Sequence, residues 1–246
     1  KMEVVDFNLI YNSLSFAIAA FGASTVFFFA QRSQVAPAYK TALTLSGLVC
    51  LIAFYHHLRM FESFNNAYTL VYGEIIVSGI RFDVAYRYLS WLLTVPLLLL
   101  QLVLVMRLSK EETYSRGIKL VFAAILMLLL GYLGEGSVTF SQLGDRWVYW
   151  LLAMIPFLYI LYNLVIALAP LILKQPKSVQ NLISNTRWLL IISWAFYPII
   201  YLFPMINQEA SYVGIQVGYT LADVLSIGIF GVMIYMIAQR KSDAGA

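Results

Sequence analysis

Charged residues and cysteines are both scarce in this sequence. Only 11% of its 246 residues are Asp, Glu, Lys or Arg, whereas soluble proteins average about 25%. Hydrophobic residues make up 61%, against roughly 45–50% in soluble chains, so we expect an integral membrane protein. The single cysteine, Cys50, excludes an intrachain disulfide. A formal charge of only +4, with no basic patch, gives no indication of nucleic-acid binding.

Motifs for catalysis and metal binding are missing as well. The sequence has two histidines and one cysteine, and it contains no metal-ligand constellation, nucleotide-binding loop or nucleophile triad. A serine nucleophile needs an adjacent base, and Ser90 has none beside it in the sequence. We therefore expect neither an enzyme nor a metalloprotein.

Seven apolar stretches are each long enough to cross a membrane, which takes about 20 helical residues. Short polar connections with Pro, Ser and charged residues separate them. We predict an all-α, single-domain bundle of seven transmembrane helices over residues 1–246, with spans at 7–31, 39–60, 84–107, 118–137, 147–173, 185–205 and 212–238. In the longest connection, 62–82, the alternation in IIVSGIRF around its central glycine predicts a short β-hairpin across one end of the bundle.

Basic residues are distributed unevenly between the connections. Eleven of the sixteen Lys and Arg residues follow spans one, three and five or lie at the C-terminus, and five lie elsewhere. Cytoplasmic connections are enriched in Lys and Arg. We therefore predict that the N-terminus is outside and the C-terminus inside.

A polar stripe runs along the third span. Five residues spaced by three or four share one helical face: Arg87, Ser90, Thr94, Leu98 and Gln101. That face must look into the bundle, because lipid would not accept Arg87. The last apolar run, YTLADVLSIGIFGVMIY, contains one acid, Asp223, and we predict that it pairs with Arg87 because either charge alone would be costly. Two alternatives stay open: Arg87 could reach the membrane surface, and Thr94 could bond its own backbone.

The stretch RYLSWLLTVPLLLLQ resembles the third helix of microbial rhodopsins, especially the proteorhodopsin and xanthorhodopsin-like group, in which R-Y-x-D-W-L-L-T-V-P-L recurs. LIAFYHHLRMF is similar to the family's second helix, WLLAMIPFLYILY to its fifth, ISWAFYPIIY to its sixth and YTLAD to its seventh. The resemblance implies a seven-helix protein of the bacterial inner membrane with a retinal pocket. It assigns six residues to that pocket: Trp91, Leu98, Trp194, Tyr197, Pro198 and Ile227.

Ile227 is the main departure from the family pattern. Microbial rhodopsins carry, four residues after the helix-seven aspartate, the lysine that forms a Schiff base with retinal; this chain has Ile227 four residues after Asp223. The stretch ADVLSIGIFG aligns without a gap, so we interpret the change as a true replacement. An open alternative is that the natural polypeptide carries a retinal-modified lysine that the printed sequence omits. As printed, the sequence implies that retinal is bound noncovalently or not at all.

Two further positions differ from the proton pumps that the chain resembles. Ser90 stands where the pumps have the aspartate that accepts the Schiff-base proton, and Gln101 stands where they have a carboxyl proton donor. Neither side chain can perform that transfer at neutral pH, so we expect no outward proton pumping. The resemblance also adds His56 to a counterion cluster with Arg87, Ser90 and Asp223.

Three functions remain open at this point. The first is a sensory or binding protein for retinal or a similar apolar ligand. The second is a light-driven anion pump with chloride as its ion, if the lysine exists, in which Ser90, Thr94 and Gln101 occupy the transport positions. The third is a structural membrane protein without a ligand. The resemblance further implies a homo-oligomer, either a trimer or a pentamer. His57 is expected at the membrane interface, about 100° around the helix from His56, and Glu135 is expected to be solvated or structural.

Overall fold

The computed structural model describes residues 2–83, 85–136, 143–207 and 211–245. Within this part of the chain, seven helical spans are long and apolar enough to cross a membrane, and the prediction of an all-α, seven-helix protein is confirmed. The α-helices are α1 (Val4–Gln31), α2 (Lys40–Ala67), α3 (Ala85–Val105), α4 (Lys110–Gly136), α5 (Leu143–Tyr162), α6 (Ala169–Leu173), α7 (Lys177–Tyr201), α8 (Phe203–Ile206), α9 (Ser211–Asp223) and α10 (Phe230–Asp243).

Several spans are built from more than one element. The fifth span runs through α5, a π-helical turn η3 (Asn163–Ala167) and α6, and the seventh through α9, a second π-helical turn η4 (Val224–Ile229) and α10. The 3₁₀ turns η1 (Arg32–Gln34) and η2 (Pro37–Tyr39) join α1 to α2. A π-helical turn is rare and often marks a functional position. Here η4 begins directly after Asp223 and contains Ile227.

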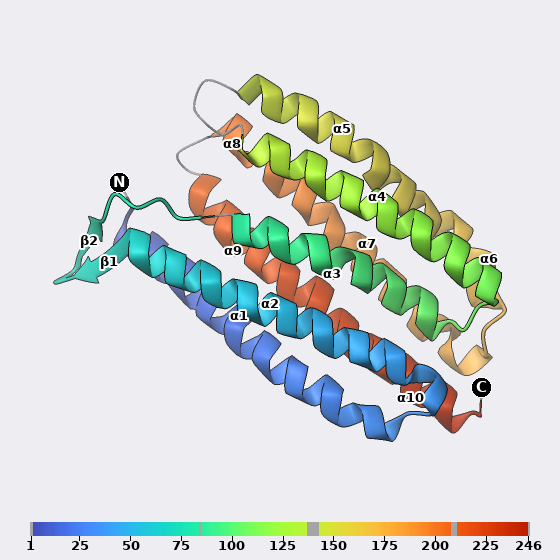
Figure 1. Ribbon diagram of the computed structural model, residues 1–246. Coiled ribbons are helices and arrows are strands. Elements are labelled where there is room, and N and C mark those ends of the chain that lie inside the picture. Colours follow the sequence, from blue (N-terminus) through green and yellow to red (C-terminus); the bar gives the residue numbers. More distant parts are fainter. Residues whose placement is uncertain (1, 84, 137–142, 208–210, 246) are drawn as a thin grey trace.

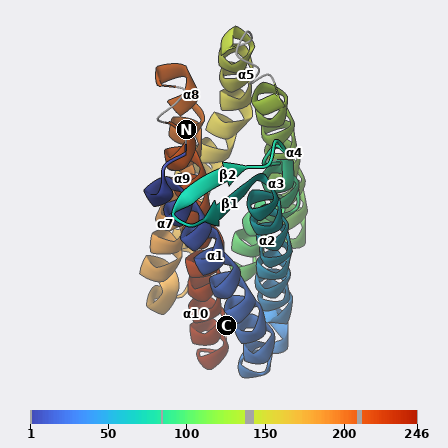
Figure 2. The same ribbon diagram turned by 90° about the vertical axis from the view of Figure 1, so that its left-hand side faces the viewer.

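Helices that are consecutive in the chain pack side by side. The pairs α1–α2, α2–α3, α3–α4 and α4–α5 are in contact, α7 packs against α5, α9 and α10, and α9 and α10 close the bundle against α1 (Figures 1 and 2). Close approach depends on a glycine in α10: a Cβ added at Gly231 would lie 2.5 Å from the ring carbon Cζ of Phe28 on α1. The Phe-Gly pair in the last span therefore lets α1 and α10 meet.

The connection between α2 and α3 forms the predicted hairpin. Strands β1 (Tyr68–Val71) and β2 (Glu74–Val77) pair antiparallel, with Tyr68 opposite Val77. The turn lies at Tyr72 and Gly73, both with positive φ (49° and 83°), as a two-residue hairpin turn requires. The expected turn glycine, Gly79, instead lies beyond β2. The hairpin crosses one end of the bundle (Figure 2), which we call the hairpin end.

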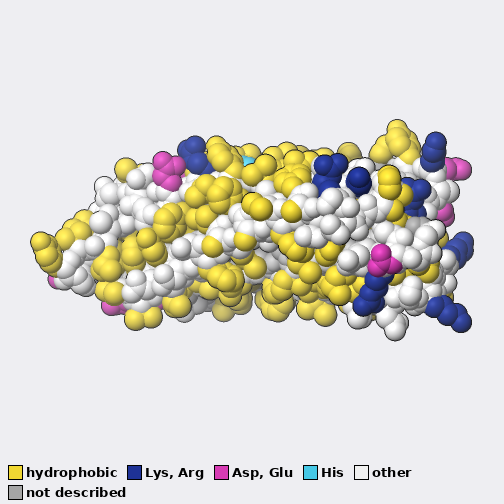
Figure 3. Space-filling view, turned by 90° about the horizontal axis from the view of Figure 1, so that it is seen from below, with side chains coloured by type: hydrophobic (Ala, Val, Ile, Leu, Met, Phe, Trp, Pro, Cys, Tyr) yellow, Lys and Arg dark blue, Asp and Glu magenta, His cyan; other side chains and the backbone are white. Residues whose placement is uncertain are grey.

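The outer surface is apolar between two polar ends. Exposed leucines, isoleucines and aromatic residues cover the sides of the bundle, whereas Lys and Arg gather at the end opposite the hairpin (Figure 3). We call this second end the C-terminal end, because α10 finishes there (Figure 1). Helices α2 and α4 extend beyond the predicted spans 39–60 and 118–137, because their polar terminal turns continue the helix outside the apolar zone.

Candidate functional site

Asp223 is the centre of a buried polar cluster. Its residue is only 1% exposed, at the junction between α9 and η4. One carboxylate oxygen, Oδ1, accepts hydrogen bonds from Trp91 Nε1 at 2.8 Å and from Tyr197 OH at 2.6 Å. These two donors come from α3 and α7. The carboxylate therefore ties three spans together at one point.

The second carboxylate oxygen of Asp223 faces two basic side chains. Arg87 NH1 and His57 Nε2 each lie 3.4 Å from Oδ2. The structure thus contains the Arg87–Asp223 pair that the sequence predicts. Arg87, itself 2% exposed, also donates through NH2 to Gln216 Oε1 at 3.2 Å and to Thr220 Oγ1 at 3.3 Å. Its charge is consequently shared among three acceptors on α9.

The structure corrects the assignment of the two histidines. His57, expected at the interface, is fully buried beside Asp223, whereas His56 is only partly buried, stacks edge-on against Tyr55 and bonds the Ile52 carbonyl. The rotation of α2 sets this choice, because the residues buried on its inner face recur every three or four positions: Ser46, Cys50, Ala53, His57, Met60 and Phe64. This spacing was visible in the sequence and points to His57.

The hydrogen bonding of His57 restricts its role. Its Nδ1 lies 2.7 Å from the carbonyl oxygen of Ala53, which can only accept, so Nδ1 carries a hydrogen. Nε2 then bears a hydrogen only when the ring is protonated. In this geometry His57 therefore donates to Asp223 only as an imidazolium cation.

The remaining stripe of α3 is buried as expected. Ser90, Thr94, Leu98 and Gln101 are each at most 1% exposed. Gln101 accepts a 2.8 Å hydrogen bond from Ser46 on α2. Within the described part of the chain, Thr94 Oγ1 and Gln101 Nε2 have no hydrogen-bond partner. The half of the α3 stripe nearer the C-terminal end therefore carries neutral hydrogen-bond donors and no carboxylate.

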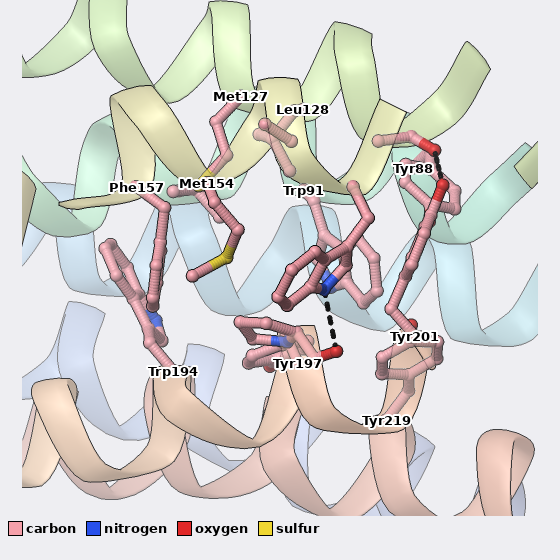
Figure 4. A pocket seen from close by; sticks show the side chains of 15 residues that line it. Tyr88, Trp91, Met127, Leu128, Met154, Phe157, Trp194, Tyr197, Tyr201 and Tyr219 are labelled. Carbon is pink, nitrogen blue, oxygen red and sulfur yellow. Dashed lines mark hydrogen bonds between the residues drawn. The ribbon is translucent and has the colours of Figure 1, made fainter. Parts of the chain in front are cut away.

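A cavity lies beside the cluster, with a volume of about 100 Å³, or about 680 Å³ of empty space when the space open to the outside is counted. Figure 4 shows the side chains that converge on it, which belong to α3, α4, α5, α7 and α9. It is lined by Tyr88, Trp91, Val95, Met127, Leu128, Gly131, Trp150, Ala153, Met154, Phe157, Trp194, Tyr197, Pro198, Tyr201 and Tyr219. Four of the six predicted pocket residues belong to this lining. Leu98 and Ile227 are buried but do not line it.

Most of the polar side-chain atoms in the cavity wall hydrogen-bond within the protein. Trp91 and Tyr197 donate to Asp223, and Trp150 Nε1 donates to the Pro198 carbonyl at 3.1 Å. Tyr201 OH donates to the Gly131 carbonyl, also at 3.1 Å, and both of these last bonds are drawn in Figure 4. The wall therefore offers a ligand mainly ring faces, ring edges and methionine side chains. Such a surface suits an apolar, conjugated molecule.

A second buried ion pair, which the sequence did not reveal, closes the cavity toward the hairpin end. Arg146 is 0% exposed; its NH1 lies 3.0 Å from Glu135 Oε2, and its Nε and NH2 donate to the Tyr201 carbonyl. Its guanidinium lies over the Tyr201 ring, 3.8 Å from the centroid. Tyr88 OH donates to the same Glu135 oxygen at 3.1 Å. Glu135 therefore has a structural role. In the sequence, this ion pair was indicated only by an arginine in the first turn of an apolar span.

The chain was compared with known protein families and curated sequences. Residues 8–240 match the family model described as bacteriorhodopsin-like protein. The green-light absorbing proteorhodopsin of a gamma-proteobacterium is 31% identical over 236 residues, which cover 94% of this chain and 88% of that protein. The blue-light absorbing proteorhodopsin of another gamma-proteobacterium is 31% identical over 223 residues, covering 89% of this chain and 82% of the relative.

Solved structures give the same result. Xanthorhodopsin, described as a light-driven ion pump with a dual chromophore, superposes with a TM-score of 0.94 and 44% identity over 99% of this chain and 97% of its own. Thermophilic rhodopsin superposes with a TM-score of 0.93 and 43% identity, covering 100% of this chain and 98% of its own. The fold and the sequence therefore agree over nearly the full length.

Proposed function

Because the chain belongs to the bacteriorhodopsin-like family of microbial rhodopsins, we propose that it binds retinal, or an apolar molecule of similar shape, without a covalent bond. It is a multi-pass protein of the bacterial plasma membrane. One observation carries the proposal: an apolar cavity lies beside the Asp223 cluster, while the position four residues after Asp223, where the resemblance requires a lysine, is Ile227. The binding step would serve sensing or storage of the ligand.

The other lysines give no substitute attachment point. Among the described residues, six lysines remain: Lys40, Lys110, Lys119, Lys174, Lys177 and Lys241. Lys241 is buried, but its Nζ donates to the carbonyls of Val105 and Met106 and to Gln175 at the C-terminal end. None of the six lines the cavity. Noncovalent binding is therefore the form of binding that these residues support.

The charge cluster also supports a site without a Schiff base. Asp223 is balanced by Arg87 and receives hydrogen bonds from Trp91 and Tyr197, so it has no need of a further cation. Ser90 and Gln101 are neutral, and a proton pump of this family would need a carboxylate at each place. We therefore propose that the protein does not pump protons outward.

A second candidate is a light-driven anion pump, which requires a lysine in the natural chain. It is favoured by the hydrogen-bond donors Thr94 Oγ1 and Gln101 Nε2, which find no acceptor in the described residues. Two such donors could serve a chloride ion that moves along α3. The printed sequence, with Ile227, favours the binding protein.

The proposed orientation places the hairpin end outside the cell and the C-terminal end in the cytoplasm. Basic residues gather at the C-terminal end (Figure 3), and cytoplasmic connections are enriched in them. The hairpin end holds fewer basic side chains on the face shown in Figure 3.

Adding all-trans retinal to the purified protein, followed by washing, tests the proposal. We expect an absorption band close to that of free retinal that survives the wash. A red-shifted visible band would indicate a protonated Schiff base and support the pump instead. If washing removes all retinal absorbance, the protein does not bind retinal, and a structural role is favoured.

A further inference from the structure

A second hollow lies on the outside of the bundle, between α3 and α4 near the hairpin end. It has a volume of about 190 Å³ and is lined by Ala85, Tyr88, Leu89, Leu92, Leu128, Leu129 and Tyr132. Leu89 and Leu129 are 51% and 47% exposed, so the groove opens to the side of the bundle, where lipid surrounds the protein. We call it the α3–α4 groove.

The α3–α4 groove and the inner cavity share part of their walls. Tyr88 and Leu128 line both spaces, and each is less than 9% exposed. A single layer of side chains therefore separates the cavity from the groove. Gly131 contributes no side chain to that layer: a Cβ built there would touch the Tyr88 ring at 3.5 Å. Rotation of Tyr88 would join the two spaces.

Tyr88 is held in its place by one hydrogen bond. Its hydroxyl donates to Glu135 Oε2 at 3.1 Å, and Glu135 is fixed by its ion pair with the buried Arg146. The Tyr88 ring also contacts Trp91 on the cavity side and Tyr132 on the groove side, at centroid distances of 5.0 and 5.5 Å. The aromatic contacts on both sides would remain available to a ring that swings, whereas the hydroxyl bond would break.

We propose that the α3–α4 groove is the lateral entrance through which an all-trans retinoid passes from the bilayer into the cavity, with Tyr88 and Leu128 as the gate. This inference rests on the proposed function, because a ligand without a covalent bond must be able to exchange. Retinoids dissolve in lipid, so a lipid-facing opening meets them at high local concentration. At the hairpin end, Arg146 and Tyr201 close the direct route from water.

A different hydrogen bond holds the wall on the opposite side of the cavity. There Trp150 of α5 lies in the wall, and its indole N–H bonds the Pro198 carbonyl of α7. Both bonds link neighbouring spans, but Trp150 bonds a backbone carbonyl, which is fixed in its helix, whereas Tyr88 bonds the side chain of Glu135. The α3–α4 side is therefore the easier passage, and the α5–α7 side provides a matched control.

Exchange kinetics test the gate, with quenching of the cavity tryptophans by all-trans retinal as the signal. Tyr88→Phe keeps the ring and removes the hydroxyl, so it should accelerate both uptake and release by roughly tenfold, the factor equivalent to about 1.4 kcal/mol. Leu129→Trp fills the groove and should slow both rates. The dissociation constant should stay within about twofold of the wild-type value in Leu129→Trp, because Leu129 does not line the cavity and a gate changes rates and not the bound state.

The matched control is Leu152→Trp, which puts the same bulk at a leucine of α5 with 42% exposure and should leave both rates unchanged. The inference is overturned if Leu129→Trp has no effect, or if Leu152→Trp slows exchange as strongly. A second probe, iodobenzene, separates this test from the proposed function, since a small aromatic molecule can enter an apolar cavity without specific recognition. The slow phase of tryptophan quenching by iodobenzene should respond to the three variants in the same order. If the rate of the slow phase is the same in all three variants, the gate is refuted, whether or not the protein binds retinal.

Discussion

The two halves of the inward face of α3 are equally buried but differ in how their polar groups are satisfied. Near the hairpin end, Arg87 donates to Asp223, Gln216 and Thr220. Toward the C-terminal end, Thr94 Oγ1 and Gln101 Nε2 are without partners among the residues described. The first half belongs to a network of charges, in which His57 Nε2 lacks a hydrogen-bond partner among the described residues, and the second is a row of neutral groups.

This difference shows which half of the stripe the stability of the fold depends on more. A buried charge that loses its partner is strongly destabilising, so the Arg87–Asp223 cluster is held in place by stability alone. A neutral donor without a partner costs less, about 1–3 kcal/mol. Neutral side chains such as Ser90 and Gln101 are therefore tolerated more easily than an unpaired charge. We infer that the stability of the fold depends more on the first half than on the second.

The largest expected effect is at the centre of the charged half. Asp223→Asn should lower the free energy of unfolding by about 3–5 kcal/mol, because Arg87 stays buried without its counter-charge. Arg87→Gln combined with Asp223→Asn should cost less than the sum of the two single changes. Denaturant unfolding in detergent measures all three variants, and strict additivity would show that the two side chains are not coupled.

The second buried pair offers a smaller effect in the same half. Arg146→Gln removes the partner of Glu135 and the bonds to the Tyr201 carbonyl. Because Glu135 keeps 14% of its side-chain surface exposed, we expect a loss of about 2 kcal/mol, less than at Asp223. Asp145→Asn, at the exposed neighbour, is the control and should change stability by no more than about 0.5 kcal/mol. Equal losses in both variants would argue against a specific role for the pair.

The smallest effect is expected in the neutral half. Gln101→Leu removes a hydrogen-bond donor, Nε2, that has no partner among the described residues. The substitution also removes the oxygen that accepts from the Ser46 hydroxyl, but this hydroxyl can still donate to the Ala42 carbonyl at 3.2 Å. The free energy of unfolding should therefore change by less than about 1 kcal/mol in either direction. A loss above about 2 kcal/mol in the same unfolding assay would reveal a bound partner at Gln101 and erase the contrast between the halves.

Much of this architecture could be predicted because it depends on local periodicity. Seven apolar runs gave seven spans, and spacing by three and four placed Arg87 and Gln101 on the buried face of α3. The pairing of Arg87 with Asp223 followed from the cost of two isolated charges in lipid. Burial and pairing rules act on single helices or on rare residues, so the sequence is enough to apply them.

The predictions were wrong or incomplete where the position of a side chain depends on the rotation of its helix and on the packing between helices. His56 was chosen over His57 by resemblance, although adjacent residues differ by about 100° around a helix, and the buried face of α2 decides the matter. Glu135 and Arg146 meet across the ends of two helices, which no spacing rule relates. The cavity stops short of Leu98 and Ile227, because its extent depends on the packing of five helices together.

The central claim is that the cavity binds its ligand without attachment, and intact mass after treatment with all-trans retinal and borohydride tests it most directly. Reduction makes any Schiff base permanent, so the wild-type chain should retain its unmodified mass, while washed samples that were not treated with borohydride should still contain extractable retinal. Ile227→Lys, which restores an amine beside Asp223, should gain one reduced retinal adduct and thereby shows that the assay works. A wild-type mass that includes a lysine or a retinal adduct would contradict the account.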